Sequence, residues 1–348
     1  MNLNLLKSVP WQDSQLLYHA QPRLNREGVN LLAPSTPYVC IGFFQDVEQE
    51  VDTAYCEEYG IPVFRREVGG GAVFLDGDQL FFQMIIHRDN PMIPEGGKLA
   101  FYRKFLQAPI EAYRALGIPA EYREVNDIVV NDRKISGCGA AEIEGHYILV
   151  GNLIVDFDYQ TMARVLKVPD EKFRDKVYRT IYENLSTVKR EIGAAPPREE
   201  LWSLMADKFK DMLGPLEVVT SVDDAWRDEA HRLAELMLTD SWLHRKGVRR
   251  LQGRDVRIRA GVDVRHRMLK APGGLMRADL EVADGRLVSV SLSGDFFLYP
   301  SEKLTTLEET VTGATLEEVR DLVQGFYQQH AIESPGVSPD DFADLITG

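Results

Sequence analysis

Short apolar runs with polar or glycine endings limit what this chain can fold into more than any other feature. Tyr38-Val-Cys-Ile-Gly42 and Leu80-Phe-Phe-Gln-Met-Ile-Ile86 both have the length and composition of buried strands. Residues 127–130 and 147–155 repeat the pattern. The sequence therefore predicts several short, largely buried strands spread over its first half.

Helical spacing of apolar residues occurs between and after these runs. It is found in residues 98–116, 199–213 and 224–238. Pro109 lies inside the first of these segments and predicts a kink or a break there. The first part of the chain is thus expected to contain both strands and helices.

A chain of 348 residues is too long to pack around one ordinary hydrophobic core, so two domains are expected. The second, a small α+β domain, is predicted to begin at about residue 247. Residues 245–270 carry ten Arg or Lys against two Asp. Asp284-Gly285 stands between two alternating runs, which is a hairpin signal. Helical patterns follow at residues 303–311 and 315–329, the latter with Thr315 expected as N-cap. We therefore predict two domains, residues 1–246 and 247–348.

Composition narrows the functional classes. The chain has 40 basic and 54 acidic residues, a net charge of −14, which argues against general nucleic-acid binding. No apolar stretch approaches the roughly 20 residues that span a bilayer, and the N-terminus lacks the pattern of a signal peptide. Three widely spaced cysteines support neither a disulfide framework nor a zinc site. We expect a cytoplasmic monomer without membrane or nucleic-acid partners.

Three consecutive glycines after two arginines form the strongest local signal. The backbones of Gly69, Gly70 and Gly71 can approach a ligand closely because they carry no Cβ. Arg65 and Arg66 could then neutralise phosphate oxygens. The alternative is a flexible turn flanked by two solvated arginines. The segment matches neither a Walker A loop nor a dinucleotide-binding fingerprint.

A second polar segment interrupts an apolar strand pattern. Asn126-Asp127 enters the strand, and Lys134 precedes the small residues of Ile135-Ser136-Gly137. A lysine beside small residues can lie close to a bound ligand, because little side-chain bulk separates them. The alternative is a solvated hairpin charge beside Asp132 and Arg133.

The ordered set of segments resembles the lipoate–protein ligase family, within the biotin/lipoate ligase superfamily. The resemblance rests on Arg-Arg-x-x-Gly-Gly-Gly-Ala-Val-Phe at 65–74, Asn-Asp-Ile-Val-Val at 126–130 and Arg-Lys-Ile-Ser-Gly at 133–137. It covers about residues 1–245, while 270–274 and 293–298 resemble the family's small accessory domain. The resemblance implies an α+β fold of mixed sheets flanked by helices, with a second, small α+β domain.

The resemblance also implies an activity and a site. The chain would activate lipoate with ATP as lipoyl-AMP and transfer the lipoyl group to a lysine of a lipoyl carrier protein. Arg66 and the run Gly71-Ala72-Val73-Phe74 would line the nucleotide, and Lys134 would bridge lipoate and the α-phosphate. Asn126 and Gly137 are expected to contact the same ligands.

Adenylation itself requires cations. A carboxylate must attack the α-phosphorus of ATP, so two anions have to be brought together and their charge neutralised. Mg²⁺ would share this task, and Asp127 is the motif carboxylate that would hold it.

Two other functions remain open. An octanoyl or lipoyl transferase of the same fold would carry the acyl group as a thioester, and Cys138 is the cysteine nearest the motif lysine. A non-catalytic protein that binds lipoate or the carrier is the other alternative. A biotin ligase is disfavoured because the arginine-rich biotin-binding glycine loop of those enzymes is missing.

The basic stretch at residues 245–270 allows three interpretations. It could dock an acidic carrier protein, bind nucleic acid or form a solvated face. The acidic C-terminal residues and the low sequence pI favour an intramolecular or carrier-docking role over nucleic-acid binding.

Overall fold

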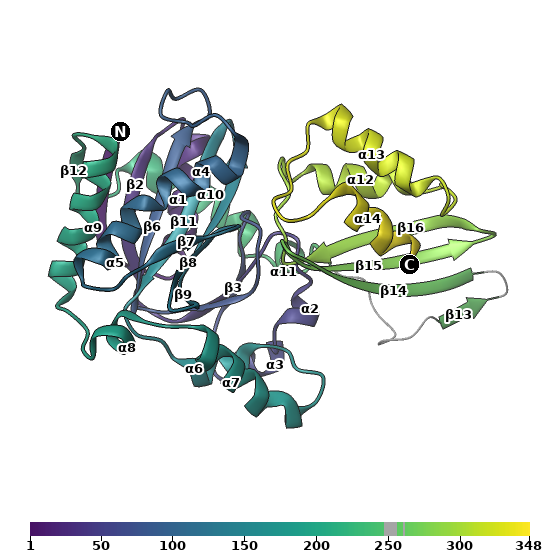
Figure 1. Cartoon of the computed structure of the whole chain (residues 1–348), viewed down its shortest axis with the longest axis horizontal. Helices are drawn as coiled ribbons and strands as arrows, with labels where there is room; N and C mark the ends of the chain where they lie inside the picture. The colour runs from purple at the N-terminus through teal and green to yellow at the C-terminus, as the bar shows by residue number, and fades with distance from the viewer. Residues whose placement is uncertain (247–255, 260–261) are drawn as a thin grey trace. The chain divides into compact units, whose positions relative to one another are not determined.

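The computed structural model describes residues 1–246, 256–259 and 262–348, which form two compact units (Figure 1). The first unit comprises Met1–Cys40, Val51–Phe64 and Val73–Thr239. The second comprises Ile41–Glu50, Arg65–Ala72 and Asp240–Gly348. The predicted domain boundary lies between residues 246 and 247, where the described residues end, and it stays a prediction. Residues 247–255 and 260–261 of the basic stretch at 245–270 also lie outside the described residues.

A six-stranded mixed sheet forms the centre of the first unit, in the order β10-β11-β6-β2-β1-β12. β1 runs parallel to β2 and β12, and the other neighbours are antiparallel. β2 is buried along its whole length, as its apolar sequence requires. The strands are β1 (Asn2–Val9), β2 (Gly28–Pro34), β6 (Gln79–His87), β10 (Gly139–Ile143), β11 (His146–Ile154) and β12 (Glu217–Val219).

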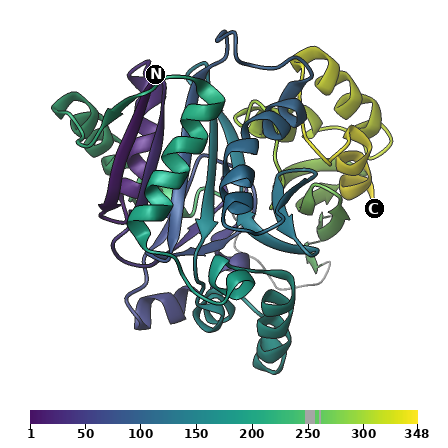
Figure 2. The ribbon, with the colours of Figure 1, turned by 60° about the vertical axis from the view of Figure 1, so that its left-hand side comes forward.

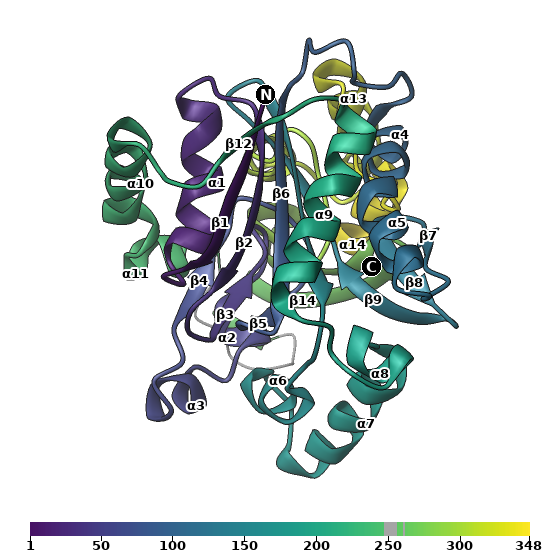
Figure 3. The same ribbon diagram turned by 90° about the vertical axis from the view of Figure 1, so that its left-hand side faces the viewer.

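Helices cover both faces of this sheet (Figures 2 and 3). Helix α1 (Asp13–Arg23) connects the parallel strands β1 and β2, and α10 (Asp224–Met237) packs against it. On the opposite face α9 (Arg198–Leu213) contacts β1 and β2 and packs against α5 (Gln107–Ala115). These contacts bury the apolar stripes that the sequence predicts for α9 and α10.

The predicted break in residues 98–116 is confirmed. Helix α4 (Gly97–Phe105) ends before Leu106, and α5 begins at Gln107. Pro109 therefore lies in the first turn of α5, where a backbone N–H has no partner within the helix and its absence costs little.

Two three-stranded sheets lie largely in the first unit and carry some of the predicted site residues. One has the order β4-β3-β5 and the other β7-β8-β9. Their strands are β3 (Tyr38–Ile41), β4 (Val63–Arg65), β5 (Val73–Leu75), β7 (Glu121–Arg123), β8 (Asp127–Val130) and β9 (Arg133–Gly137). The first unit also contains α3 (Thr53–Glu58), α6 (Tyr159–Val165), the 3₁₀ helix η1 (Glu171–Phe173), α7 (Arg174–Asn184) and α8 (Val188–Ile192). Helices α2 (Val47–Glu50) and α11 (Asp240–Leu243) belong to the second unit.

The second unit is an antiparallel sheet in the order β13-β14-β15-β16, with helices on one face (Figure 1). Asp284 and Gly285 both have positive φ, which confirms the predicted hairpin between β15 and β16. The strands are β13 (Val256–Arg259), β14 (Val262–Ala271), β15 (Gly274–Ala283) and β16 (Arg286–Gly294). The helices are α12 (Lys303–Val311), α13 (Val319–His330) and α14 (Pro339–Thr347).

Two details of this unit differ from the sequence prediction. Helix α13 begins at Val319, one turn later than expected, because the carboxylate of Glu318 accepts hydrogen bonds from the amide and hydroxyl of Thr315 and holds a turn there. The hydrophobic core also includes Phe43 and Phe44, from far earlier in the chain. The ring of Phe44 stacks on Phe296 with centroids 5.0 Å apart.

The fold is thus α+β, as predicted, with mixed sheets, flanking helices and a small C-terminal α+β part. Among the described residues, none of the helices combines the length and apolar character needed to cross a bilayer.

Candidate functional site

An ion pair joins the predicted residues Lys134 and Asp127. Strands β8 and β9 form a tight hairpin, whose turn residues Asn131 and Asp132 both have positive φ. This hairpin brings Lys134 Nζ to 2.6 Å from Asp127 Oδ1, and 36% of the lysine side chain stays exposed. The ammonium group is therefore held in place by a counter-ion, while part of the lysine side chain stays exposed.

Asp127 binds a second cation that the sequence prediction missed. Arg123 Nη2, on the neighbouring strand β7, donates to Asp127 Oδ2 over 2.9 Å. Burial alone would raise the pKa of Asp127, but Lys134 and Arg123 more than offset it, and the pKa lies below its ordinary value. The carboxylate is thus ionised at neutral pH.

Buried amide side chains connect the lysine strand to β5. Asn152 Oδ1 accepts from the backbone N–H of Gly137 over 2.9 Å, and its Nδ2 donates to Gln79 Oε1 over 2.7 Å. Gln79 Nε2 in turn donates to the carbonyl of Phe74 over 3.1 Å. The predicted residues Gly137 and Phe74 are therefore linked through two amides. In the sequence, both amide residues are recognisable as polar residues inside or beside a buried apolar run.

The predicted residue Asn126 contributes to the same strand arrangement. Its Nδ2 donates to the carbonyl oxygen of Cys138, which fixes the end of β9. Tyr113, fully buried on α5, donates its hydroxyl proton to the carbonyl of Ile135 over 2.6 Å and accepts from the N–H of Ile154 over 3.0 Å. Hydrogen bonds from Tyr113 to Ile135 and from Asn126 to Cys138 thus hold β9 in place.

The triple glycine lies against the segment Asp295–Phe297 within the second unit. Gly70 N–H donates to the Phe296 carbonyl over 3.2 Å, and a Cβ on Gly69 would lie only 2.7 Å from the same oxygen. Gly70 has φ +88°, a conformation that favours glycine. These glycines therefore allow their backbone to approach another group closely, and in the structure that group is the backbone of residues 295–297. Their predicted contact with a ligand stays a prediction.

The two arginines before the glycines have different surroundings. Arg66, half-buried, donates to the carbonyls of Gly69 and Gly71 over 2.8 and 3.0 Å. Arg65 is fully buried, and its guanidinium donates to a set of backbone carbonyls, those of Gly42, Phe43, Gln45, Trp242 and Leu243. This geometry gives Arg65 a structural role and weighs against its predicted contact with phosphate.

The predicted residues thus fall into two groups. Val73, Phe74, Asn126, Asp127, Lys134 and Gly137 belong to the first unit. Arg65, Arg66, Gly69, Gly70, Gly71 and Ala72 belong to the second.

A methyl group at Gly70 is expected to destabilise the second unit by about 1 kcal/mol or more, because φ is positive and the added Cβ would lie 3.0 Å from Phe297 Cζ. Urea unfolding followed by tryptophan fluorescence measures this loss. Gly325→Ala is the matched control, since Gly325 lies in α13 and its Cβ would meet open space. Equal stability of Gly70→Ala and the wild type would contradict the strain inferred here.

The thiol of Cys138 is in no position to act as a nucleophile at neutral pH. The residue is buried, and burial raises the pKa of the thiol to about 12, despite a contact of 3.3 Å between its Sγ and Ser136 Oγ. Burial likewise raises the pKa of Cys56 to about 11. The neutral thiols behave as small apolar groups.

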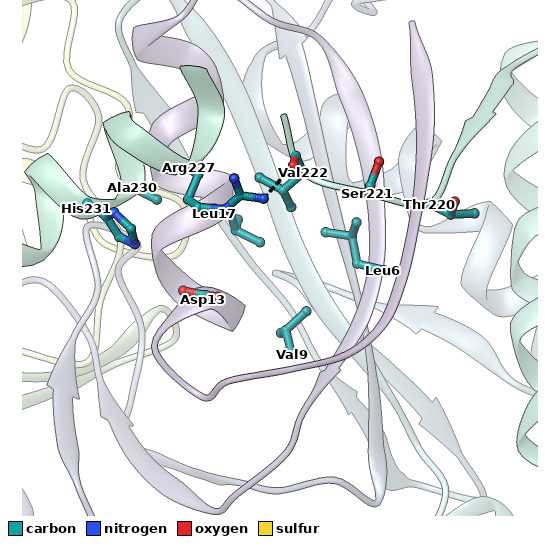
Figure 4. Close-up of a pocket in the computed structure, with 10 residues that line it drawn as sticks. All are labelled: Leu6, Val9, Asp13, Leu17, Thr220, Ser221, Val222, Arg227, Ala230 and His231. Atoms are coloured by element: carbon teal, nitrogen blue, oxygen red, sulfur yellow. Dashed lines mark hydrogen bonds between the residues drawn. The ribbon is translucent and has the colours of Figure 1, made fainter. Parts of the chain in front are cut away.

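A separate cavity of about 260 Å³ lies between α1 and α10, and none of the predicted residues lines it (Figure 4). Its wall includes Leu6, Leu17 and Val222, while Arg227 donates to the carbonyl of Val222 over 2.9 Å. Burial raises the pKa of Asp13, with His231 and Arg227 acting in the opposite sense. The cavity therefore belongs to the packing of the two helices, away from the lysine hairpin.

Comparison with known proteins agrees with this geometry. Residues 9–210 match the family model of the lipoyl protein ligase A/B catalytic domain. The lipoate-protein ligase LplJ of Bacillus subtilis is 28% identical over 320 residues, covering 89% of this chain and 88% of that protein. The octanoyltransferase LipM of Kyrpidia tusciae is 24% identical over 232 residues, covering 60% and 84%.

A solved structure provides the same match in three dimensions. The bi-partite lipoate protein ligase of Thermoplasma acidophilum, described with its E2 lipoyl domain, superposes with a TM-score of 0.63. It is 26% identical and covers 72% of this chain and 98% of that chain. Together with the family model, which spans more than half of the sequence, these similarities show that the chain belongs to the lipoyl protein ligase A/B catalytic-domain family.

Proposed function

We propose that this protein is an ATP-dependent ligase that converts lipoate to lipoyl-AMP and transfers the lipoyl group to a lysine of a carrier domain. The observation that carries the proposal is the part-exposed Lys134, whose ammonium lies 2.6 Å from Asp127 on the β8–β9 hairpin. A fixed cation of this kind is what the meeting of a carboxylate and a phosphate requires, since it costs no reorganisation during the reaction.

Two steps make up the reaction. In the first, a carboxylate oxygen of lipoate attacks the α-phosphorus of ATP, the bond to pyrophosphate breaks, and Lys134 neutralises the charge that gathers between the two anions. In the second, the neutral amine of the carrier lysine attacks the lipoyl carbonyl, AMP leaves with the bonding electrons, and the nitrogen loses a proton to the surrounding water. The Lys134–Asp127 pair keeps the ammonium in place before substrate arrives, and the substrate anions then compete with Asp127 for it.

A role of Asp127 toward Mg²⁺ would require the ion to displace Lys134 or Arg123, which pair with its two carboxylate oxygens. Magnesium is commonly held by one or two carboxylates together with the phosphates of the nucleotide. Among the described residues no cluster of three or more His, Cys, Asp or Glu side chains could hold a metal on its own. We propose that Asp127 supplies the protein ligand while ATP supplies phosphate oxygens. The ion would add positive charge at the phosphates.

The main alternative is an acyl transferase that works through a cysteine thioester, and the similarity to LipM favours considering it. The buried Cys138, whose thiol pKa is raised to about 12, argues against that chemistry at this position.

Replacing Cys138 with serine is therefore expected to leave lipoylation within about twofold of the wild type, because the activated species is an adenylate and the side chain is nearly isosteric. Lipoylation of a carrier domain is measured by intact mass, with Cys56→Ser as control. Loss of transfer in Cys138→Ser, together with a trappable acyl-enzyme in the wild type, would support the transferase instead.

Pyrophosphate release tests the proposed function. The wild type mixed with ATP and lipoate should release pyrophosphate and form lipoyl-AMP, and omission of either substrate should abolish both. A non-catalytic lipoate-binding protein would bind lipoate and release none.

The division of labour along the chain is part of the proposal. We assign the chemistry to residues 1–246 and an accessory role to residues 247–348. A monomeric, cytoplasmic protein remains our prediction.

A further inference from the structure

Two cations, Lys134 and Arg123, bind the two oxygens of one carboxylate. The strands β7, β8 and β9 form one sheet, and their register places Arg123 opposite Asp127 (Figure 1). Lys134 Nζ lies 2.6 Å from Asp127 Oδ1, and Arg123 Nη2 donates to Oδ2 over 2.9 Å. A charged lysine and an ionised aspartate alone would sum to zero charge. The three groups in contact instead carry one net positive charge, and Arg123 is its source.

The guanidinium of Arg123 has donors to spare. An arginine side chain carries five N–H groups in a planar fork. Besides the bond to Asp127, Nη1 donates to the carbonyl of Asp132 over 3.3 Å, and 46% of the side chain stays exposed. N–H groups are therefore left for phosphate oxygens, which a guanidinium binds well.

Exposed acids on the same sheet have to be weighed against this charge. Glu124 lies 3.9 Å from a cation of its own, Arg103. Glu121 and the carboxylate of Asp132 form no ion pair with either cation of the Asp127 cluster in the described part of the chain. The positive charge beside Asp127 is thus a matter of direct contact, and the argument needs no long-range field.

The positions of the two strands indicate which phosphates each cation would meet. β9, which carries Lys134, contacts β11 of the six-stranded sheet, whereas Arg123 lies on β7 and is exposed. The apolar tail of lipoate gains from burial, while the pyrophosphate that is released has to reach solvent. The inner cation therefore suits the α-phosphate, where the carboxylate attacks, and the outer cation suits the phosphates that leave.

We infer that Arg123 is the second cation of the adenylation site and that it binds the β- and γ-phosphates of ATP while Lys134 neutralises the α-phosphate. The inference rests on the proposed function, in which the carboxylate and the phosphate meet at Lys134. Arg123 can bind the outer phosphates without leaving Asp127, because the remaining N–H groups of its fork suffice. Asp127 thus keeps a counter-ion when the substrate anions draw Lys134 away.

Titration with α,β-methylene ATP tests the inference without catalysis, since this analogue cannot release pyrophosphate. Its Kd is measured by calorimetry in the presence of Mg²⁺. We expect Arg123→Gln to raise this Kd roughly tenfold or more, because a charge-assisted contact is lost. The Kd for AMP, which lacks the outer phosphates, should stay within about twofold, because the contact with the α-phosphate remains. Arg123→Lys retains the charge without the fork and should restore only part of the binding.

Arg114→Gln is the matched control. Arg114 on α5 is 47% exposed, pairs with a carboxylate over 2.8 Å and donates to a backbone carbonyl over 3.0 Å, so its surroundings resemble those of Arg123. Its substitution should change the Kd of neither nucleotide. Circular dichroism verifies that each variant is folded.

The Asp127→Asn background separates direct contact from an effect through Asp127. There the carboxylate charge is gone, so an arginine that only compensates it would have no further effect. We expect Arg123→Gln to raise the Kd of the analogue in this background too. An unchanged Kd in either background, or an equal rise for AMP and the analogue, would overturn the inference. A wild type that binds the analogue but releases no pyrophosphate from ATP and lipoate would overturn the proposed function alone.

Discussion

Lys134→Ala is expected to lower the rate of lipoyl-AMP formation by about 10²–10³-fold or more while the protein stays folded. The size follows from losing one preorganised cation at the position where charge develops in the transition state. Folding should survive because the lysine side chain is partly exposed and its carboxylate partner Asp127 keeps Arg123. Pyrophosphate release measures the rate, and circular dichroism measures the fold.

Two control variants separate this effect from a general loss of charge. Lys7→Ala removes a similarly exposed lysine from an ion pair of 2.7 Å with Glu199 and should leave adenylation unchanged. Lys134→Arg retains the charge with a different geometry and should recover only part of the rate. If Lys134→Ala kept more than about a tenth of the wild-type pyrophosphate release, the assignment of Lys134 to the adenylation site would be wrong.

Arg65→Ala is expected to lower the free energy of unfolding by at least about 3 kcal/mol, more than any other proposed variant. The substitution leaves several buried carbonyl groups without their charged donor. These carbonyls belong to Gly42, Phe43, Gln45, Trp242 and Leu243, so one side chain joins two distant parts of the sequence. Trp242 reports the change directly, because its indole N–H donates to the Arg65 carbonyl over 2.9 Å. Urea unfolding followed by tryptophan fluorescence is the measurement.

Arg66→Ala provides the comparison for Arg65. Arg66 is half-buried, and its bonds to Gly69 and Gly71 lie within its own loop, so its replacement should cost clearly less. Arg65→Lys should also destabilise, because an ammonium group cannot reproduce the fork of donors. If Arg65→Ala and Arg66→Ala were equally stable, the structural role assigned to Arg65 would be wrong.

The sequence predicted those features that depend on local pattern. The strands at residues 38–41 and 127–130 follow from short apolar runs, and the hairpin at Asp284-Gly285 follows from residues that accept positive φ. The pairing of Asp127 with Lys134 was not predicted, although it also has a local cause, because a short turn at Asn131-Asp132 returns the chain on itself.

Features that depend on distant contacts were not predictable. The sequence beside Arg65 suggests a phosphate ligand, whereas the carbonyls that bind its guanidinium come partly from residues about 180 positions later. Phe43 and Phe44 look like the end of an N-terminal strand, yet they pack in the core of the second unit. The amide pair Gln79 and Asn152 could be suspected only from polar residues in apolar surroundings, since 73 positions separate them.

The most direct test of the proposed function is the intact mass of an unlipoylated E2 lipoyl domain after incubation with the protein, lipoate and ATP. The proposal predicts addition of one lipoyl group, dependent on both small molecules and accompanied by pyrophosphate release. Modification of the domain without ATP, from an acyl thioester and through an acylated cysteine of this chain, would contradict it.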